Sequence, residues 1–319
     1  MVTCPLIVLA GPTAGGKTAL ALQLAQEFDG EIVSCDSVAV YREMEIGTAK
    51  PSREERTLVQ HHMIDVVWPD EACTAGDYSR GAREALAGIT ERGHLPIVAG
   101  GTGLYLRALI DGLFPAPPVH PGHRERLRER ARTHGAAYVH RLLTRLDPAA
   151  AAAIHANDVP KVVRAIEVSL AARQPLTEQW QKGRDPLTGY RILRLGLEPP
   201  RPLLYERINR RAAAMFDRGL IEETERLIER YGRDCRPLTS LGYAEAAAVL
   251  RGELTREQAV AHAQQGHRNY AKRQATWFRR EPDFHWFHGF GSDAEIADEA
   301  RQLVARHLDG NEDTEHAED

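Results

Sequence analysis

Short apolar runs alternate with longer helical patterns in the first third of the chain. Leu6–Ala10, Glu31–Cys35 and Pro96–Ala99 are predominantly apolar, and each run ends in a polar or glycine-rich loop. Helical patterns follow the first and third runs, at Thr18–Phe28 and Leu104–Ile110. Strands that alternate with helices are typical of a parallel sheet covered by helices on both faces. Because such sheets bind ligands at the carboxyl ends of their strands, we expect the functional residues in these loops.

The composition changes after this first third. A proline-rich boundary contains Pro115, Pro117, Pro118 and Pro121. Beyond it, His123–Ala171 is rich in Arg and Ala, with helical periodicity and no strand pattern. We therefore predict an all-helical insertion at residues 119–189. It would interrupt an α/β core formed by residues 1–118 and 190–308.

The second part of the predicted core is mostly helical. Arg191–Leu197 alternates apolar and polar residues, which predicts a return to the sheet. The pattern over Pro202–His307 is helical, with a break near Asp234–Pro237. Residues 309–319 hold six acidic side chains and no Lys or Arg, and we expect this tail to be disordered.

Composition excludes several classes of protein. The 319 residues are 43% hydrophobic and 27% charged, which is ordinary for a globular chain and unlike a disordered or collagen-like one. No apolar run reaches the ~20 residues needed to span a bilayer. The cysteines lack metal-binding or Cys-x-x-Cys spacing, which predicts buried thiols in a reducing cytosol. They are Cys4, Cys35, Cys73 and Cys235.

The most specific motif is G-P-T-A-G-G-K-T at Gly11–Thr18, which follows a predicted strand and opens a predicted helix. This is the context of a P-loop, whose backbone N–H groups and helix N-terminus surround a di- or triphosphate. Lys17 supplies positive charge, and the Thr18 hydroxyl can bind Mg²⁺. The residues predicted to hold the phosphates are Gly11, Thr13, Ala14, Gly15, Gly16, Lys17 and Thr18. The motif predicts an α/β fold with a P-loop NTPase-like parallel sheet, but it does not specify the reaction.

Two further strand ends carry candidate chemistry. Asp36-Ser37 follows the second strand, where a carboxylate could hold Mg²⁺, bind substrate, act as a general base, or cap a turn. Gly100–Gly103 follows the third predicted strand and includes the Thr102 hydroxyl. This loop either allows a ligand to approach the backbone or packs a helix tightly on the sheet. The pair His61-His62 has no third ligand in a metal-binding pattern.

Two stretches are strongly basic. Arg268–Arg280 contains five cations, no acidic residue and three interleaved aromatic rings, and His123–Arg145 contains seven Arg against two Glu. Such stretches can neutralise phosphates and stack on unpaired bases. The alternative for Arg268–Arg280 is a solvated basic helix face with its aromatic rings in the core.

Taken together, these motifs resemble those of one known protein family. The chain resembles the tRNA dimethylallyltransferases, which modify the adenosine 3′ to the anticodon. The matching segments are Gly11–Thr18, Ser34–Tyr41, Met44–Pro51, His61–Asp65, Gly100–Leu106, Asn157-Asp158, Arg164–Val168, Leu241–Glu245 and Tyr270–Arg279. They occur in order from the start of the chain to about Arg280.

The resemblance implies transfer of a dimethylallyl group from its diphosphate to the exocyclic amine of that adenosine. The P-loop would then hold a diphosphate leaving group with Mg²⁺, bound through Thr18. Asp36 would be the general base, Thr102 would position the amine or the prenyl carbon, and Arg211 would neutralise the departing diphosphate. The resemblance also implies a cytoplasmic monomer with no membrane segment and with the tRNA anticodon stem-loop as its partner.

The resemblance further implies a set of tRNA-binding residues. They are Asp36, Ser37, Val38, Ala39, Thr102, His123, Lys161, Arg164, Gly242, Tyr243, Lys272, Arg273, Gln274, Trp277 and Arg279. Three positions depart from the family's usual residues. Gly15 stands where Ser is frequent, Ala39 where many members have Gln, and Lys161 where Arg is common. At position 161, a lysine ammonium would offer a phosphate a single point charge, whereas an arginine would make a bidentate contact.

Two other classes share part of the pattern. A nucleotide or small-molecule kinase would have the P-loop but would not require the basic stretches. A non-catalytic RNA-binding protein would use the basic stretches but leave the P-loop without a role. Transfer from dimethylallyl diphosphate without a nucleoside triphosphate separates the kinase from a prenyltransferase.

Overall fold

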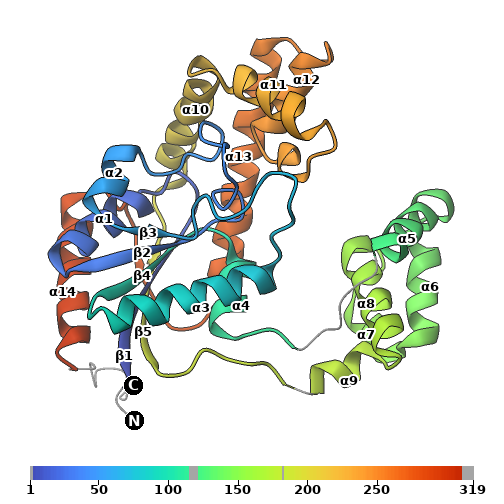
Figure 1. Cartoon of the computed structure of the whole chain (residues 1–319), viewed down its shortest axis with the longest axis horizontal. Helices are drawn as coiled ribbons and strands as arrows, with labels where there is room; N and C mark the ends of the chain where they lie inside the picture. Colours follow the sequence, from blue (N-terminus) through green and yellow to red (C-terminus); the bar gives the residue numbers. More distant parts are fainter. Residues whose placement is uncertain (1–2, 115–120, 182, 311–319) are drawn as a thin grey trace. The chain divides into compact units, whose positions relative to one another are not determined.

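The structure is a computed structural model that describes residues 3–114, 121–181 and 183–310. In this part of the chain, six strands form one parallel sheet in the order β3-β2-β4-β1-β5-β6. Strands β1 to β5 are labelled in Figure 1. The strands are β1 (Cys4–Ala10), β2 (Gly30–Cys35), β3 (His61–His62), β4 (Leu95–Gly100), β5 (Tyr190–Leu197) and β6 (Phe284–Phe287). The predicted parallel α/β sheet and the return of Arg191–Leu197 to it are confirmed.

The central strand β1 is apolar throughout because it is buried on both faces. Leu6 and Val8 pack into one hydrophobic cluster, and Ile7 and Leu9 into another, with each side chain at most 1% exposed. The first cluster includes α3 (Ala75–Glu91) and α4 (Gly103–Ile110), and the second includes α1 (Lys17–Glu27) and α14 (Ala294–Leu308). Helices therefore cover both faces of the sheet, as the apolar runs predict.

The C-terminal part of the core contains four helices before the last strand. They are α10 (Arg201–Asp217), α11 (Leu220–Tyr231), α12 (Tyr243–Leu250) and α13 (Arg256–Phe278). A short 3₁₀ helix, η1 (Arg236–Thr239), lies at the predicted break. The prediction of an otherwise helical segment over Pro202–His307 is wrong at Phe284–Phe287, which pairs with β5 as β6. Four residues are too few to distinguish the period of a strand from that of a helix.

The edge strand β3 was also missed. It contains only His61 and His62, which pair with Ile32 and Val33 of β2, and it follows the short helix α2 (Arg53–Leu58). The His62 ring lies 2.6 Å from Glu31, and the Nδ1 atom of His61 lies 2.8 Å from the Val59 carbonyl oxygen. In the described ranges no group of three His, Cys, Asp or Glu side chains is arranged to hold a metal ion.

A second compact unit comprises residues 111–186, whereas the sequence places the insertion at 119–189. Its helices are α5 (Pro121–His134), α6 (Ala136–Leu146), α7 (Pro148–Ala153), α8 (Val159–Ala172) and α9 (Leu176–Gln181). The absence of a strand over His123–Ala171 agrees with the prediction. Leu143, Val162 and Ile166 form part of this unit's own core, and Arg124 makes a bidentate ion pair with the buried carboxylate of Glu167.

Some sequence predictions fall outside the described residues. Pro115, Pro117 and Pro118 of the predicted boundary do so, as do residues 311–319 of the acidic tail. The four cysteines are all described and unpaired, and Cys35, Cys73 and Cys235 are buried. In the described ranges no helix combines the length and apolarity that crossing a membrane requires.

Candidate active site

The loop between β1 and α1 has the backbone conformation of an anion-binding turn. Ala14 and Gly16 both have positive φ angles, of 63° and 92°. A Cβ atom on Gly16 would lie 2.7 Å from the backbone nitrogen of Gly291, so the loop also needs glycine there for space. The Lys17 ammonium donates to the carbonyl oxygens of Gly11, at 3.0 Å, and Pro12, at 2.8 Å. The predicted strand–loop–helix context is therefore confirmed.

A cavity of about 490 Å³ opens beside this loop at the carboxyl ends of β2 and β4. Its walls include residues from the P-loop, from the segment after β2, from α10 and from α13. The sequence-predicted site residues that line it are Thr13, Ala14, Gly15, Gly16, Lys17, Thr18, Asp36, Ala39, Arg211 and Gln274. Gly11 lines a separate cavity of about 190 Å³, which lies between β5, α10 and α13.

Positive charge collects in the larger cavity. Burial lowers the pKa of Lys17 to about 8, the nearby Arg211 acts in the same direction, and the Asp36 carboxylate opposes both effects. Burial likewise lowers the pKa of Arg211, and Asp36 again raises it. The Arg211 side chain makes no hydrogen bond or ion pair with any residue that the structure describes. A cation enclosed in this way without a partner favours an anionic ligand.

The Asp36 carboxylate is held rigidly by the backbone that follows it. Its Oδ1 atom accepts hydrogen bonds from Val38 N, at 2.8 Å, and Ala39 N, at 3.2 Å. Its Oδ2 atom has no hydrogen-bond partner among the described residues. Asp36 therefore caps a turn and also presents a second oxygen that is free to accept a proton.

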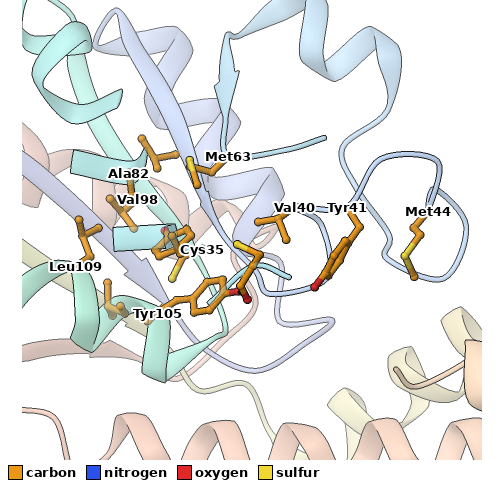
Figure 2. Packing of buried hydrophobic residues seen from close by; sticks show 14 of the residues in the cluster. Cys35, Val40, Tyr41, Met44, Met63, Ala82, Val98, Tyr105 and Leu109 are labelled. Carbon is orange, nitrogen blue, oxygen red and sulfur yellow. The ribbon is translucent and has the colours of Figure 1, made fainter. Parts of the chain in front are cut away.

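The residue that precedes Asp36 is anchored in the hydrophobic core. Cys35, the last residue of β2, is 2% exposed and lies in one cluster with Val98, Tyr105 and Leu109 (Figure 2). The Cys35 carbonyl oxygen accepts hydrogen bonds from Gly101 N, at 3.2 Å, and Thr102 N, at 3.1 Å. Burial raises the pKa of the Cys35 thiol to about 12, so the thiol is neutral at physiological pH.

Thr102 is bonded to Ser37, the residue that follows Asp36, although Thr102 does not line the cavity. Its hydroxyl oxygen accepts a hydrogen bond from Ser37 N at 3.1 Å, which ties the loop after β4 to the loop after β2. Both polar strand ends predicted from the sequence thus meet at one edge of the sheet.

Tyr270 and Arg207 are among the polar residues that line the cavity and that the sequence did not identify as site residues. Burial, and next the charge of Asp36, raise the pKa of Tyr270 to about 12, and a hydrogen bond with Thr102 lowers it. Arg207 contacts the Ser292 hydroxyl and lies over the Phe290 ring. Arg207 and Arg211 are four residues apart on α10, a spacing that places them on one helix face and that could have identified the pair.

The residues predicted to bind tRNA differ widely in exposure. Lys272, Arg273 and Arg279 are exposed at α13, where Arg279 is paired with Glu198. Trp277 is partly buried, and Arg107 lies over its ring. The residues predicted to bind tRNA that are buried are Ala39, Gly242, Tyr243 and Gln274.

The remaining predicted tRNA-binding residues lie near the carboxylate or in the second unit. Ser37 and Val38 follow Asp36 directly and are partly exposed. His123 lies on α5, and Lys161 and Arg164 lie on α8. Within that unit, the Lys161 ammonium pairs with the Asp158 carboxylate, and the Arg164 guanidinium lies near the Glu167 carboxylate.

Comparison with known proteins agrees with this geometry. A family described as IPP transferase matches residues 39–281, and one described as isopentenyl transferase matches residues 4–67. A tRNA dimethylallyltransferase of Koribacter versatilis is 63% identical over 94% of this chain and 97% of its own length. The chain belongs to the tRNA dimethylallyltransferase family. A second family member, from Solibacter usitatus, is 51% identical over 95% of this chain and 99% of its own.

Solved structures of tRNA-modifying transferases share the fold. The tRNA isopentenylpyrophosphate transferase of Bacillus halodurans is 36% identical, with a TM-score of 0.72 over 98% of this chain and 99% of its own. A eukaryotic dimethylallyltransferase acting on tRNA is 25% identical, with a TM-score of 0.84 over 98% of this chain and 82% of its own. Each of these two structures matches 98% of this chain.

Proposed function

We propose that the protein transfers the dimethylallyl group of dimethylallyl diphosphate to the exocyclic amine of the adenosine 3′ to the anticodon in tRNA. In this reaction a bond forms between the amine nitrogen and C1 of the prenyl group, and the bond from C1 to the diphosphate oxygen breaks. The amine proton passes to Asp36 and the diphosphate leaves. The observation that carries the proposal is the shared cavity of Lys17, Arg211 and the Asp36 carboxylate.

The cations of the cavity suit the leaving group. Lys17, Arg211 and the N-terminus of α1 surround a space that would favour a diphosphate, and they would stabilise the charge that grows on it as C1 departs. Arg207 adds a third cation to the same wall. Because these groups are held in place before the reaction, little reorganisation is needed in the transition state.

The Asp36 carboxylate is suited to accept the proton of the adenosine amine. An exocyclic amine is a weak nucleophile because its lone pair is delocalised into the purine ring. A base that takes its proton as the new bond forms is worth typically about 10²–10⁴-fold in rate. Asp36 has a free oxygen for this role, and we assign Thr102 to positioning the amine or the prenyl carbon. The target base would leave the RNA loop to enter the cavity, at a cost of a few kcal/mol.

The donor set at the P-loop is compatible with Mg²⁺. Mg²⁺ commonly takes one or two protein oxygens together with substrate phosphate oxygens and waters. The Thr18 hydroxyl is exposed and lines the cavity, and we assign it to the ion. When bound, Mg²⁺ would neutralise part of the diphosphate charge.

We assign RNA binding to the exposed cations. Lys272, Arg273 and Arg279 at α13, and His123, Lys161 and Arg164 in the helical unit, would contact phosphates of the anticodon stem-loop. Such an enzyme would work in the cytoplasm, where tRNA is modified, and we propose that it acts as a monomer.

The test is incubation of the purified protein with dimethylallyl diphosphate, Mg²⁺ and an unmodified anticodon stem-loop, followed by mass spectrometry of the RNA. We expect a mass gain of one prenyl unit without any nucleoside triphosphate. A stem-loop with inosine at the target position is the matched control, because it lacks only the exocyclic amine. Unmodified adenosine RNA after prolonged incubation, or prenylation of the inosine control, would refute the proposal.

A further inference from the structure

Gln274 occupies a buried position between two loops of the candidate active site. It lies on α13 and is only 5% exposed. Its Oε1 atom accepts a hydrogen bond from Thr13 N at 2.8 Å, and its Nε2 atom donates to the Gly101 carbonyl oxygen at 2.9 Å. Both ends of the carboxamide are therefore engaged within the protein. This arrangement differs from that expected of a residue that contacts RNA.

The two segments that Gln274 joins serve different substrates in the proposed reaction. Thr13 belongs to the P-loop, which would hold the diphosphate. Gly101 precedes Thr102, whose hydroxyl is bonded to the residue after Asp36, and this segment would hold the acceptor amine. The Gln274 carboxamide thus joins the segment that would hold the leaving group to the segment next to the general base.

The bridge tolerates little displacement. A Cβ atom added to Gly101 would lie 2.1 Å from the Gln274 Nε2 atom, so the carboxamide packs directly against the backbone of the loop. A buried polar contact of this kind is costly to break, because each orphaned backbone group loses its partner without gaining water.

The chemistry of the bridge requires a glutamine. The Thr13 N–H needs an acceptor and the Gly101 carbonyl needs a donor, and the two ends of one carboxamide supply both. An ionised glutamate of the same shape supplies only acceptors, so its second oxygen would repel the Gly101 carbonyl. A protonated glutamate could restore the donor.

We propose that Gln274 is a positioning residue that sets the distance between the diphosphate site and the Asp36–Thr102 acceptor site. The inference rests on the proposed prenyl transfer. A misplacement of about 1 Å between reacting groups can cost about 10²-fold in rate, while each substrate still binds its own half of the site. Gln274 therefore acts on the rate of the chemical step, and not on the affinity for either substrate.

The decisive experiment measures single-turnover prenyl transfer by Gln274→Glu and by the wild-type protein from pH 6 to pH 9. Burial favours the protonated form of the introduced carboxyl group, which can donate to the Gly101 carbonyl, and a rising pH removes that proton. We expect the ratio of variant to wild-type rate to fall by about 10²-fold as the pH rises. Titration with dimethylallyl diphosphate alone, and with stem-loop alone, should give dissociation constants within about threefold of the wild type.

A second variant reaches the same contact from the other side. Gly101→Ala pushes the carboxamide away by its added methyl group, and we expect a slower rate that does not depend on pH in the manner of Gln274→Glu. Gln265→Glu is the matched control, because it makes the same chemical change at an exposed position of α13, and it should behave as the wild type. Thermal unfolding at each pH identifies any variant that has lost its fold.

The outcomes separate this inference from the proposed function. Absence of prenyl transfer by the wild-type protein refutes the proposed function itself. If the wild type transfers the group and Gln274→Glu matches its rate at every pH, the positioning role is wrong. A defect confined to the dissociation constants, with normal single-turnover rates at saturation, also overturns it and assigns Gln274 to substrate binding.

Discussion

Lys17 and Asp36 line the same cavity, and the carboxylate acts on the ionisation of the cation. Burial is the main cause that lowers the pKa of Lys17 to about 8, with Arg211 acting in the same direction and the Asp36 carboxylate opposing them. The fold thus brings Lys17 and Asp36 into one cavity. A cavity that is to hold both a diphosphate and an acceptor amine requires this arrangement.

The Asp36→Asn variant should lose prenyl transfer while it keeps its structure. An amide Oδ1 can still accept the hydrogen bonds from Val38 N and Ala39 N, so the turn survives, but the base is lost. We expect a fall of about 10²–10⁴-fold in the single-turnover rate, with RNA affinity within a few-fold of the wild type. Turnover equal to that of the wild type would remove Asp36 as the general base.

Dimethylallyl diphosphate should bind more weakly as the pH rises above about 8. Below this pKa Lys17 is a cation and attracts the diphosphate, and above it the free protein holds a neutral amine. Isothermal titration should show an affinity loss of about tenfold between pH 7 and pH 9, since a group is about one-tenth protonated one unit above its pKa.

Two variants control for ionisation of other groups. Lys17→Met should bind weakly throughout, without this dependence on pH. Arg211→Gln removes a cation that lowers the Lys17 pKa, so its affinity loss should begin at a higher pH. Equal affinity of the wild type at pH 7 and pH 9 would contradict the assignment of Lys17 to the diphosphate.

Changing Lys272 and Arg273 together to Ala should reduce the salt dependence of RNA binding. Each side chain is exposed on α13, and removing one phosphate contact lowers the slope of log K against log salt by about 0.7–0.9. Filter binding of the stem-loop across a salt series measures this slope. Arg301→Ala on α14 is a control that removes a cation elsewhere, and it should leave the slope as it is. An unaltered slope in the double variant would exclude this face from the RNA interface.

Tyr243→Phe tests a structural role for a residue that the family resemblance assigns to tRNA. The Tyr243 side chain is completely buried, and its hydroxyl donates to Glu223 at 2.7 Å and accepts from Gly47 N at 3.2 Å. Removing the hydroxyl leaves a buried N–H without its acceptor, which we expect to lower the free energy of unfolding by about 1–3 kcal/mol. Urea denaturation measures this. A loss of RNA affinity with unchanged stability would instead support direct contact.

Local patterns were sufficient to predict the strands that carry the site. β1 and β4 are almost wholly apolar and β2 has an apolar centre at Ile32-Val33, because these strands are buried inside the sheet, and a run that ends in a polar loop is visible in the sequence alone. β3 and β6 were missed because they are two and four residues long at the edges of the sheet. At that length the pairing partner, rather than the residue pattern, decides the conformation.

The sequence by itself determined the P-loop, since a strand, a glycine-rich turn and a helix N-terminus lie within one continuous segment whose geometry is local. It also placed Asp36 and Thr102 at strand ends, where a parallel sheet gathers them. Only the tertiary structure decided that Arg207, Tyr270 and Gln274 meet this loop, and that Gln274 and Tyr243 use their polar atoms within the protein. Contacts between residues more than 160 positions apart depend on how α10, α12 and α13 pack, and no periodicity within those helices specifies which polar side chain is enclosed.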